Sequence, residues 1–192
     1  MINLDRLQKE KQSFRYFAYH LSYPEQDESL VEMPYERYVS HSHPSYVYVR
    51  QYEENMKHKD LFQRQMLYTE TFDFQQDTTL YMTYVKFADS KERGQMLARL
   101  KILYEMFGLM MPDGELSDFL PLMCEFIYVA DWQGDSRALE SFSLLFAVIE
   151  DGTYHLLNAL EKYESPYAPL IRGFRETCKA CIMQEEGAKI ND

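Results

Sequence analysis

Cys178 and Cys181 come closest, among the residues of this sequence, to a catalytic or metal-binding motif. A C-x-x-C pair can form a redox-active dithiol or one half of a zinc site. A zinc site needs two further ligands at matching spacing, and a thioredoxin-type motif needs a preceding strand, whereas both cysteines fall in a predicted helix. We therefore interpret them as ordinary thiols, and Cys124, which has no nearby base in the sequence, as a small apolar core residue.

Histidines offer a second set of potential metal ligands. His41, His43 and His58 could supply imidazole nitrogens from a loop, but no carboxylate-rich or Cys-rich spacing completes the set, which favours a solvated loop. The sequence contains no Gly-rich phosphate loop, no G-x-S-x-G and no H-E-x-x-H, which removes the common nucleotide-binding, hydrolase and metalloprotease classes. We assign no catalytic residue, no metal ligand and no cofactor to the chain.

Carboxylates dominate the charge of the sequence. The formal net charge is −11, and the segment from Met110 to Ser165 holds eleven acidic residues against two basic ones. Such a surface repels a phosphate backbone and suits a cationic partner such as a basic peptide, so we expect no nucleic-acid binding. Solubility alone is the simpler explanation of the same charge.

Asp118 and Glu125 are seven residues apart, which is about two turns along one face of a helix. The two carboxylates could line an acidic cleft. Alternatively, Asp118 caps its helix and Glu125 is simply buried or solvated. Spacing alone does not decide between these two interpretations, because acid–base chemistry needs a pair forced together in a pocket.

The elements that must position these residues are predicted to be helices. The chain has 192 residues, 46% of them hydrophobic, with only 7 Gly and 7 Pro, which favours one all-α domain over a sandwich or barrel. We expect this domain to cover residues 1–184, followed by a disordered tail, 185–192. The absence of a leader or a long apolar run, together with an odd number of cysteines, predicts a cytoplasmic protein.

Apolar periodicity and capping residues predict the order of the helices. We expect helices over residues 4–22, with Lys9, Lys11 and Arg15 on the polar face, over 26–39, interrupted at Pro34, and over 45–56. Further helices are expected from a cap at Asp60 to Phe72, over a short turn at 80–84, from a cap at Asp89 or Ser90 to Phe107, from 116–118 onward, over 137–150, over 154–163 after a break or bend at Gly152, and from 165 through Cys181.

Four blocks of the sequence resemble those of a known family. They are Tyr68-Thr69-Glu70-Thr71-Phe72-Asp73, Leu80-Tyr81-Met82-Thr83-Tyr84, Asp89-Ser90-Lys91-Glu92-Arg93-Gly94 and Glu115-Leu116-Ser117-Asp118-Phe119-Leu120-Pro121. With residues 21–24 and 165–170 in the same order, the sequence is similar to the respiratory nitrate reductase delta chains, which are molybdenum-cofactor assembly chaperones of the NarJ type. Ser117 departs from the Pro that is common in the family, and we interpret it as a helix cap.

The resemblance implies an all-helical fold shared with the chaperones of the trimethylamine-oxide and dimethyl-sulfoxide reductases, and no enzymatic activity. It also implies that the protein binds the N-terminal segment of the apo catalytic (alpha) subunit as an amphipathic helix. Binding would hold that subunit back from the membrane so that the molybdenum cofactor can be inserted before docking. Proteins that deliver the cofactor are a second class of implied partner, and no insertion of the chaperone itself into the membrane is expected. The alternatives are a chaperone of another molybdoenzyme reductase, or a metal-binding regulator that uses His41, His43, Cys178 and Cys181.

We predict a peptide-binding groove between the helix of the first block and the helix opened by Leu116. Leu80, Tyr84, Phe119 and Leu120 would form its floor, and Asp73, Asp118 and nearby carboxylates would meet basic side chains of the peptide. Asp89 and Arg93 would contribute, or would instead cap and clamp their own helix. The full predicted set is Tyr68, Phe72, Asp73, Leu80, Tyr84, Asp89, Arg93, Leu116, Asp118, Phe119, Leu120 and Glu125.

Overall fold

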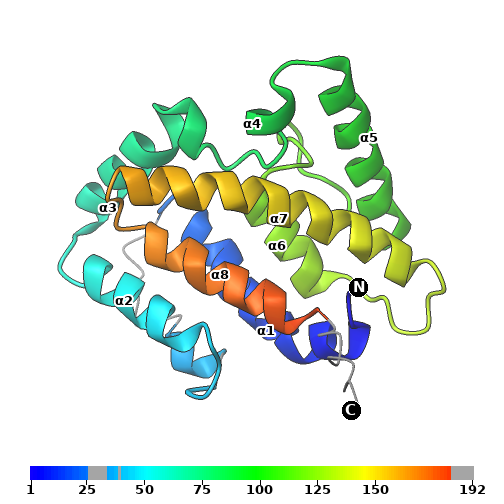
Figure 1. Cartoon of the computed structure of the whole chain (residues 1–192), viewed down its shortest axis with the longest axis horizontal. Helices are drawn as coiled ribbons and strands as arrows, with labels where there is room; N and C mark the ends of the chain where they lie inside the picture. Colours follow the sequence, from blue (N-terminus) through cyan, green and yellow to red (C-terminus); the bar gives the residue numbers. More distant parts are fainter. Residues whose placement is uncertain (26–33, 39, 183–192) are drawn as a thin grey trace, which may run out of the picture.

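The computed structural model describes residues 1–25, 34–38 and 40–182, and every regular element in these ranges is helical (Figure 1). The predicted all-α fold is therefore confirmed. The α-helices are α1 (Leu4–Leu21), α2 (Tyr46–Met56), α3 (Leu61–Tyr68), α4 (Tyr84–Phe87), α5 (Lys91–Met106), α6 (Leu120–Val129), α7 (Ala138–Lys162) and α8 (Ala168–Ala180). Three shorter helical turns are Tyr35–Arg37, Thr69–Asp73 and Gln76–Thr78.

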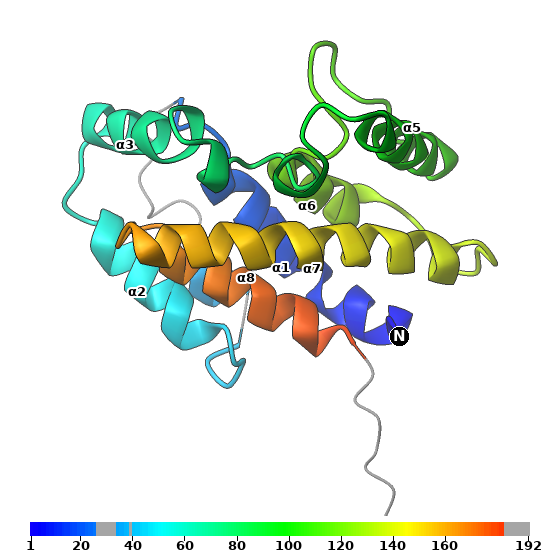
Figure 2. The ribbon, with the colours of Figure 1, turned by 45° about the horizontal axis from the view of Figure 1, so that its top comes forward.

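Helices α1 and α8 form the middle of the bundle. α1 packs against α6 and α8, and α8 also packs against α2 and α7. The long helix α7 runs across the bundle in both ribbon views, and α5 stands at the edge of the molecule (Figures 1 and 2). The ends of the described chain meet, since the backbone N–H of Asn3 donates to the carbonyl oxygen of Cys181 at 2.9 Å.

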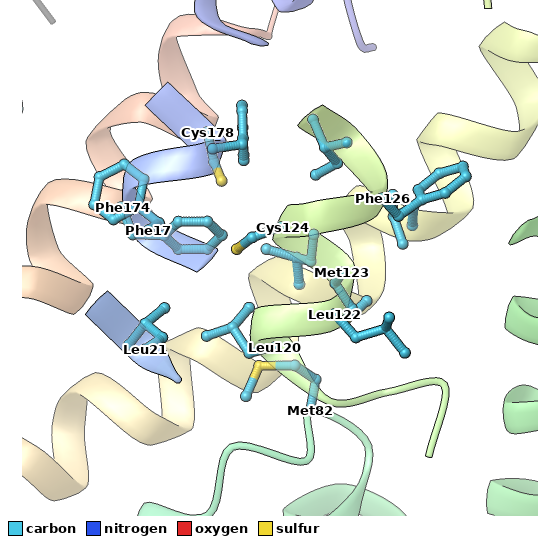
Figure 3. Close-up of a cluster of buried hydrophobic side chains, with 14 of the residues drawn as sticks. Phe17, Leu21, Met82, Leu120, Leu122, Met123, Cys124, Phe126, Phe174 and Cys178 are labelled. Carbon is cyan, nitrogen blue, oxygen red and sulfur yellow. The ribbon is translucent and has the colours of Figure 1, made fainter. Parts of the chain in front are cut away.

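Aromatic and aliphatic side chains from α1, α6, α7 and α8 fill the core. The rings of Phe14 and Phe17 lie edge-on to Phe174, with centroids 6.0 and 5.2 Å away. Leu120 and Cys124 of α6 point toward α1 beside Leu21 and Phe17, respectively (Figure 3). These contacts fix α6 on α1 and so determine what lies on the outer faces of the two helices.

Local sequence signals place several helices correctly. Asp60 forms a capping box with Gln63 at the start of α3, Ser90 caps α5 through the backbone N–H of Arg93, and Gly108 adopts a φ of 83° after the last turn of α5. The helix predicted over 45–56 is present as α2. The predicted tail, 185–192, and most of the helix predicted over 26–39 lie outside the described residues. Within the second range, Tyr35–Arg37 is a 3₁₀ turn.

The predicted interruption at Gly152 is wrong, because α7 continues through it to Lys162. The glycine serves a close approach instead. A Cβ atom at position 152 would lie 2.6 Å from the carbonyl oxygen of Met82 and 2.7 Å from its Cβ atom. Gly152 therefore lets the segment around Met82 lie directly on α7, and this segment adjoins the candidate site.

Candidate binding groove

A groove of about 630 Å³ lies on the surface between the second half of α1 and α6, and we call it the α1–α6 groove. One stripe of each helix lines it. The lining consists of Arg15, Ala18 and Tyr19 of α1 with its C-cap Ser22, of Pro121, Leu122, Glu125, Tyr128 and Val129 of α6, and of Pro112, Glu115 and Phe119 of the loop before α6. The spacings are those of a single helix face, so the groove is the outer seam of a helix pair whose inner faces form the core.

The two helices run antiparallel along this seam. Lys11 Nζ donates to the carbonyl oxygen of Ala130 at 2.6 Å, and Arg15 donates to the hydroxyl oxygen of Tyr128 at 3.5 Å. At the other end, Leu21 lies beside Leu120 (Figure 3). The groove therefore has one end at Arg15 and Tyr128, and another at Ser22 and Phe119.

Charge in the α1–α6 groove is acidic on balance and is not neutralised internally. Glu125 is exposed and has no ion-pair partner within the described part of the chain. Glu115 accepts a hydrogen bond from the Tyr81 hydroxyl at 3.1 Å, and burial, followed by the charge of Glu115, raises the pKa of Tyr81 to about 12. Tyr81 therefore stays a neutral donor to this carboxylate. Arg15 is the cation of the lining.

An isolated β-bridge fixes Phe119 at the end of the groove. The Met82 N–H donates to the Asp118 carbonyl and the Leu120 N–H donates to the Leu80 carbonyl, both at 2.9 Å. The rings of Tyr81 and Phe119 consequently lie 5.3 Å apart. The helical turn predicted at 80–84 is wrong for residues 80–82, since their backbone is used in this bridge, and helix α4 begins only at Tyr84.

The start of α6 also differs from the prediction. The helix begins at Leu120, with Phe119 as its N-cap and Pro121 in its first turn, rather than at 116–118. Ser117 is not a cap, because its hydroxyl donates to the Leu97 carbonyl oxygen at 2.7 Å and its carbonyl accepts from the Tyr104 hydroxyl at 2.6 Å. Ser117 thus joins α5 to the loop before α6. Burial raises the pKa of its partner Tyr104, so this hydroxyl stays a neutral donor.

Asp118, predicted to face a bound peptide, is completely buried. Its Oδ2 atom accepts hydrogen bonds from the backbone N–H and the hydroxyl of Thr83 and lies 3.4 Å from a guanidinium nitrogen of Arg93. We call Thr83, Arg93 and Asp118 the Arg93–Asp118 clamp. The carboxylate is therefore internally paired, and the geometry favours the clamping alternative for Arg93.

Arg93 holds the clamp together because it has several partners on different elements. Only 8% of the residue is exposed, and its Nε donates to the Thr83 hydroxyl at 3.2 Å. Its guanidinium lies 5.1 Å from the ring centroid of Tyr84, and Asp89, which is exposed, is 3.5 Å away. The predicted residues Tyr84, Asp89, Arg93 and Asp118 are thus brought together, but as an internal junction of α4, α5 and the start of α6.

Four other predicted residues belong to the core. Tyr68, Phe72, Leu80 and Leu120 are each no more than 5% exposed. The Tyr68 hydroxyl donates to the Leu21 carbonyl at 3.2 Å, and the Phe72 ring lies 4.7 Å from Tyr167. Leu80 and Leu120 therefore do not form the floor of a surface groove, and this corrects the predicted location between the first block and α6.

The remaining predicted residues lie on the surface in three places. Phe119 and Glu125 line the α1–α6 groove, whereas Asp73 is exposed at the end of the turn after α3. Leu116, 40% exposed, lines a separate groove of about 440 Å³ between α5 and residues 110–117. Glu115 and Pro112 border both grooves, so the loop before α6 separates them.

Sequence reasoning missed most of the α1 wall and the far end of α6. The predicted binding residues do not include Ala18, Tyr19, Tyr128 and Val129, which line the groove. Arg15 is predicted only as part of the polar face of its helix. The available signal was the presence of apolar residues outside the core stripe, such as Tyr19 and Val129, which are 38% and 46% exposed in the structure. Pairing α1 with α6, however, is tertiary information that periodicity does not supply.

The metal-binding alternative finds no assembled site within residues 1–25, 34–38 and 40–182. No group of three or more His, Cys, Asp or Glu side chains there could hold an ion. Cys178 and Cys181 are buried, and burial raises the pKa of both thiols, for Cys181 to about 12. In the same ranges, no helix has both the length and the apolar character required to cross a membrane.

Comparisons with known proteins agree with the motif resemblance. The chain is 36% identical over 104 residues to the probable nitrate reductase molybdenum cofactor assembly chaperone NarJ of Bacillus subtilis, covering 54% of this chain and 53% of that protein. It is 35% identical over 75 residues to the probable chaperone NarW of Escherichia coli, covering 39% of this chain and 32% of NarW.

A third relative is longer. The nitrate reductase-like protein NarX of Mycobacterium tuberculosis is 33% identical over 101 residues, which cover 53% of this chain and 14% of NarX. The match thus spans about half the length of the Bacillus relative and less of the other two, and no family model matches the chain. Over about half its length, this chain is similar to curated chaperones of nitrate reductase assembly, which confirms the resemblance seen in its motifs.

Proposed function

We propose that this protein is an assembly chaperone of a nitrate reductase. It binds the N-terminal segment of the apo catalytic subunit in the α1–α6 groove and holds the subunit in a state that accepts the molybdenum cofactor before membrane docking. The names of the relatives support the general role. The identity of the client segment and the timing are our inferences from the family resemblance and from the shape and charge of the groove.

The observation that carries the proposal is an apolar seam beside two carboxylates that have no ion-pair partner among the described residues. Tyr19, Phe119 and Val129 offer apolar surface, while Glu115 and Glu125 add negative charge beside it. An amphipathic helix binds such a groove through apolar anchors at i, i+3, i+4 and i+7, with its basic side chains toward the acidic rim. The groove therefore suits a basic amphipathic peptide better than an acidic or uniformly polar one.

The dimensions suit a short helical segment. Residues 121–129 of α6 cover about 12 Å, because each helical residue rises about 1.5 Å, and this corresponds to roughly two turns of a bound helix. Apolar anchors over two turns supply most of the affinity, while the carboxylates of the rim mainly raise the association rate and set the register. A segment of this length leaves the rest of the catalytic subunit free for cofactor insertion.

Calorimetric titration tests the proposal. The purified chain is titrated with a synthetic peptide of the catalytic subunit's N-terminus, with a scrambled peptide of the same composition as the control. We expect saturable binding of the native peptide alone, weakening as salt rises because part of the attraction is electrostatic. Equal binding of both peptides, or no binding by the demonstrably folded chain, would contradict the proposal.

The N-terminal peptides of other molybdoenzyme catalytic subunits provide the specificity control. If the protein serves a nitrate reductase, the nitrate reductase peptide binds most tightly, because specificity is a difference between affinities. Tighter binding of a peptide from another reductase would reassign the client but keep the groove. The comparison of peptides therefore tests which reductase is the client independently of whether the groove binds such peptides at all.

A further inference from the structure

We infer that a client helix lies in the α1–α6 groove in one direction, with its N-terminal end at Ser22 and Phe119 and its C-terminal end at Arg15 and Tyr128. The inference rests on the proposed function and adds the polarity of binding. Its basis is the unequal distribution of charge along the groove, whose two ends the antiparallel helix pair makes distinct.

The end near Phe119 is the acidic end. Glu115 is held near Phe119, because its carboxylate accepts a hydrogen bond from the Tyr81 hydroxyl and the Tyr81 ring packs on Phe119. Glu125 lies one helical turn after Pro121, in the middle of the α6 wall. Glu115 therefore marks the Phe119 end and Glu125 lies at the middle, and neither carboxylate has an ion-pair partner within the described chain.

The end near Tyr128 is the basic end. The guanidinium of Arg15 is exposed, donates to the Tyr128 hydroxyl at 3.5 Å and lies 5.5 Å from the centre of that ring. Its described contacts leave its charge without a carboxylate partner. Lys11 lies beyond Arg15; its ammonium group donates to the Ala130 carbonyl and lies 4.5 Å from the centre of the Trp132 ring. Because the charge of Asp131 offsets that of Lys11, we assign the basic character of this end to Arg15.

A bound helix responds to this gradient through its own dipole and side chains. The N-terminus of a helix carries about half a positive charge and its C-terminus about half a negative charge, so the two ends prefer carboxylates and a guanidinium, respectively. Basic side chains in the first turns of the client add to the same preference. The dipoles of α1 and α6 oppose each other along the groove, so the side-chain charges decide the direction.

Spin labels at the two ends of the groove test the direction. Asp113 is exposed beside the acidic end and Gln12 is exposed one turn before Arg15, and neither lines the α1–α6 groove. Asp113→Cys and Gln12→Cys are each labelled with a nitroxide, while the three native cysteines are buried and react poorly. The isotope-labelled client peptide is then observed by NMR in complex with each labelled protein.

We expect the label at position 113 to broaden signals of the peptide's N-terminal residues, and the label at position 12 to broaden those of its C-terminal residues. The opposite pattern would overturn the direction while leaving the proposed function intact. Equal or absent broadening in a saturated complex would overturn the direction and the groove together. A peptide that fails to bind the unlabelled chain in calorimetry would remove both proposals.

A second measurement does not depend on the labels. A peptide that ends at the last helical residue is prepared with a free carboxylate and with an amidated C-terminus. We expect Arg15→Gln to weaken binding of the free-carboxylate peptide about two- to fivefold more than binding of the amidated peptide, the size of a helix-end charge effect. Equal weakening of the two peptides would show that the C-terminus lies elsewhere.

Discussion

The α1–α6 groove and the Arg93–Asp118 clamp share the loop that precedes α6, yet they differ in how their charges are used. In the clamp, Asp118 is fully buried and lies 3.4 Å from a guanidinium nitrogen of Arg93. In the groove, Glu125 is exposed and has no ion-pair partner among the described residues. The clamp's charges hold α4, α5 and α6 together, whereas the groove's charges remain available to another molecule.

The comparison shows why one acidic motif can serve two purposes. The bridge between Tyr81 and Phe119 fixes the backbone so that Asp118 turns inward and the Phe119 side chain reaches the groove. Neighbouring side chains on an extended backbone point in opposite directions, so consecutive residues are divided between core and surface. Variants of the two regions should therefore separate loss of stability from loss of binding.

The largest effect is expected from breaking the clamp. Asp118→Ala leaves the Arg93 guanidinium buried without its main partner, which should lower the free energy of unfolding by about 3 to 5 kcal/mol. Urea denaturation measures the loss, and Asp113→Ala, at an exposed position, provides the control with an expected change within about 0.5 kcal/mol.

The double variant Arg93→Met/Asp118→Leu sharpens this test. Because both charges are removed together, it should lose less stability than the sum of the two single variants. Strict additivity, or a stability of Asp118→Ala equal to that of the parent, would show that the pair does not hold the fold.

The next effect concerns the support beneath the bridge. Gly152→Ala places a methyl group 2.6 Å from the Met82 carbonyl oxygen, so we expect a loss of about 1 to 3 kcal/mol in the free energy of unfolding. Gly94→Ala is the matched control, because a Cβ atom at this helical position would have no neighbouring atom within 4 Å. This substitution should raise the free energy of unfolding by about 0.5 to 1 kcal/mol. Thermal unfolding of both variants gives the comparison, and a neutral Gly152→Ala would mean that residues 80–82 are seated elsewhere.

An effect on binding is expected at Phe119. Phe119→Ala removes an apolar anchor from the groove and should weaken client-peptide binding by about 1 to 3 kcal/mol in calorimetry. Leu120→Ala is the contrasting neighbour, because Leu120 is fully buried and its truncation should cost about 2 to 5 kcal/mol of stability instead. If the folded Phe119→Ala protein binds the peptide as tightly as the parent, Phe119 is not an anchor.

The smallest effect is expected from the groove charge. Glu125→Arg should lower affinity by about 1 kcal/mol or less, mainly through slower association with a weaker salt dependence, and should leave stability within about 0.5 kcal/mol. Stopped-flow association rates at several salt concentrations measure this effect. Glu105→Arg, on the wall of the α5 groove, is the matched charge reversal, and an equal effect there would indicate general attraction rather than a specific rim.

Local signals in the sequence predicted much of the helical framework. The caps Asp60 and Ser90 and the apolar stripe of α1 depend on neighbours a few residues away, so they can be inferred without the tertiary fold. The continuity of α7 could not, because Gly152 signals a break in isolation and its role depends on Met82, which is distant in sequence.

The candidate site was predicted only in part for the same reason. Phe119, from the motif, and Glu125, from its spacing to Asp118, do line the groove, but Asp118, predicted to meet basic side chains of the peptide or to cap its helix, is fully buried. Its partner Arg93 comes from another helix, and the α1 wall comes from the start of the chain. Neither pairing can be read from spacing within one segment.

The central claim is that the α1–α6 groove, and not the clamp or the α5 groove, binds the client. Amide NMR shifts of the labelled chain, recorded with and without the catalytic subunit's N-terminal peptide, test it most directly. We predict that the shifts concentrate in residues 15–22 and 119–129, with the scrambled peptide producing none. Shifts concentrated in residues 97–111 of the α5 groove, or around Asp73, would contradict the claim.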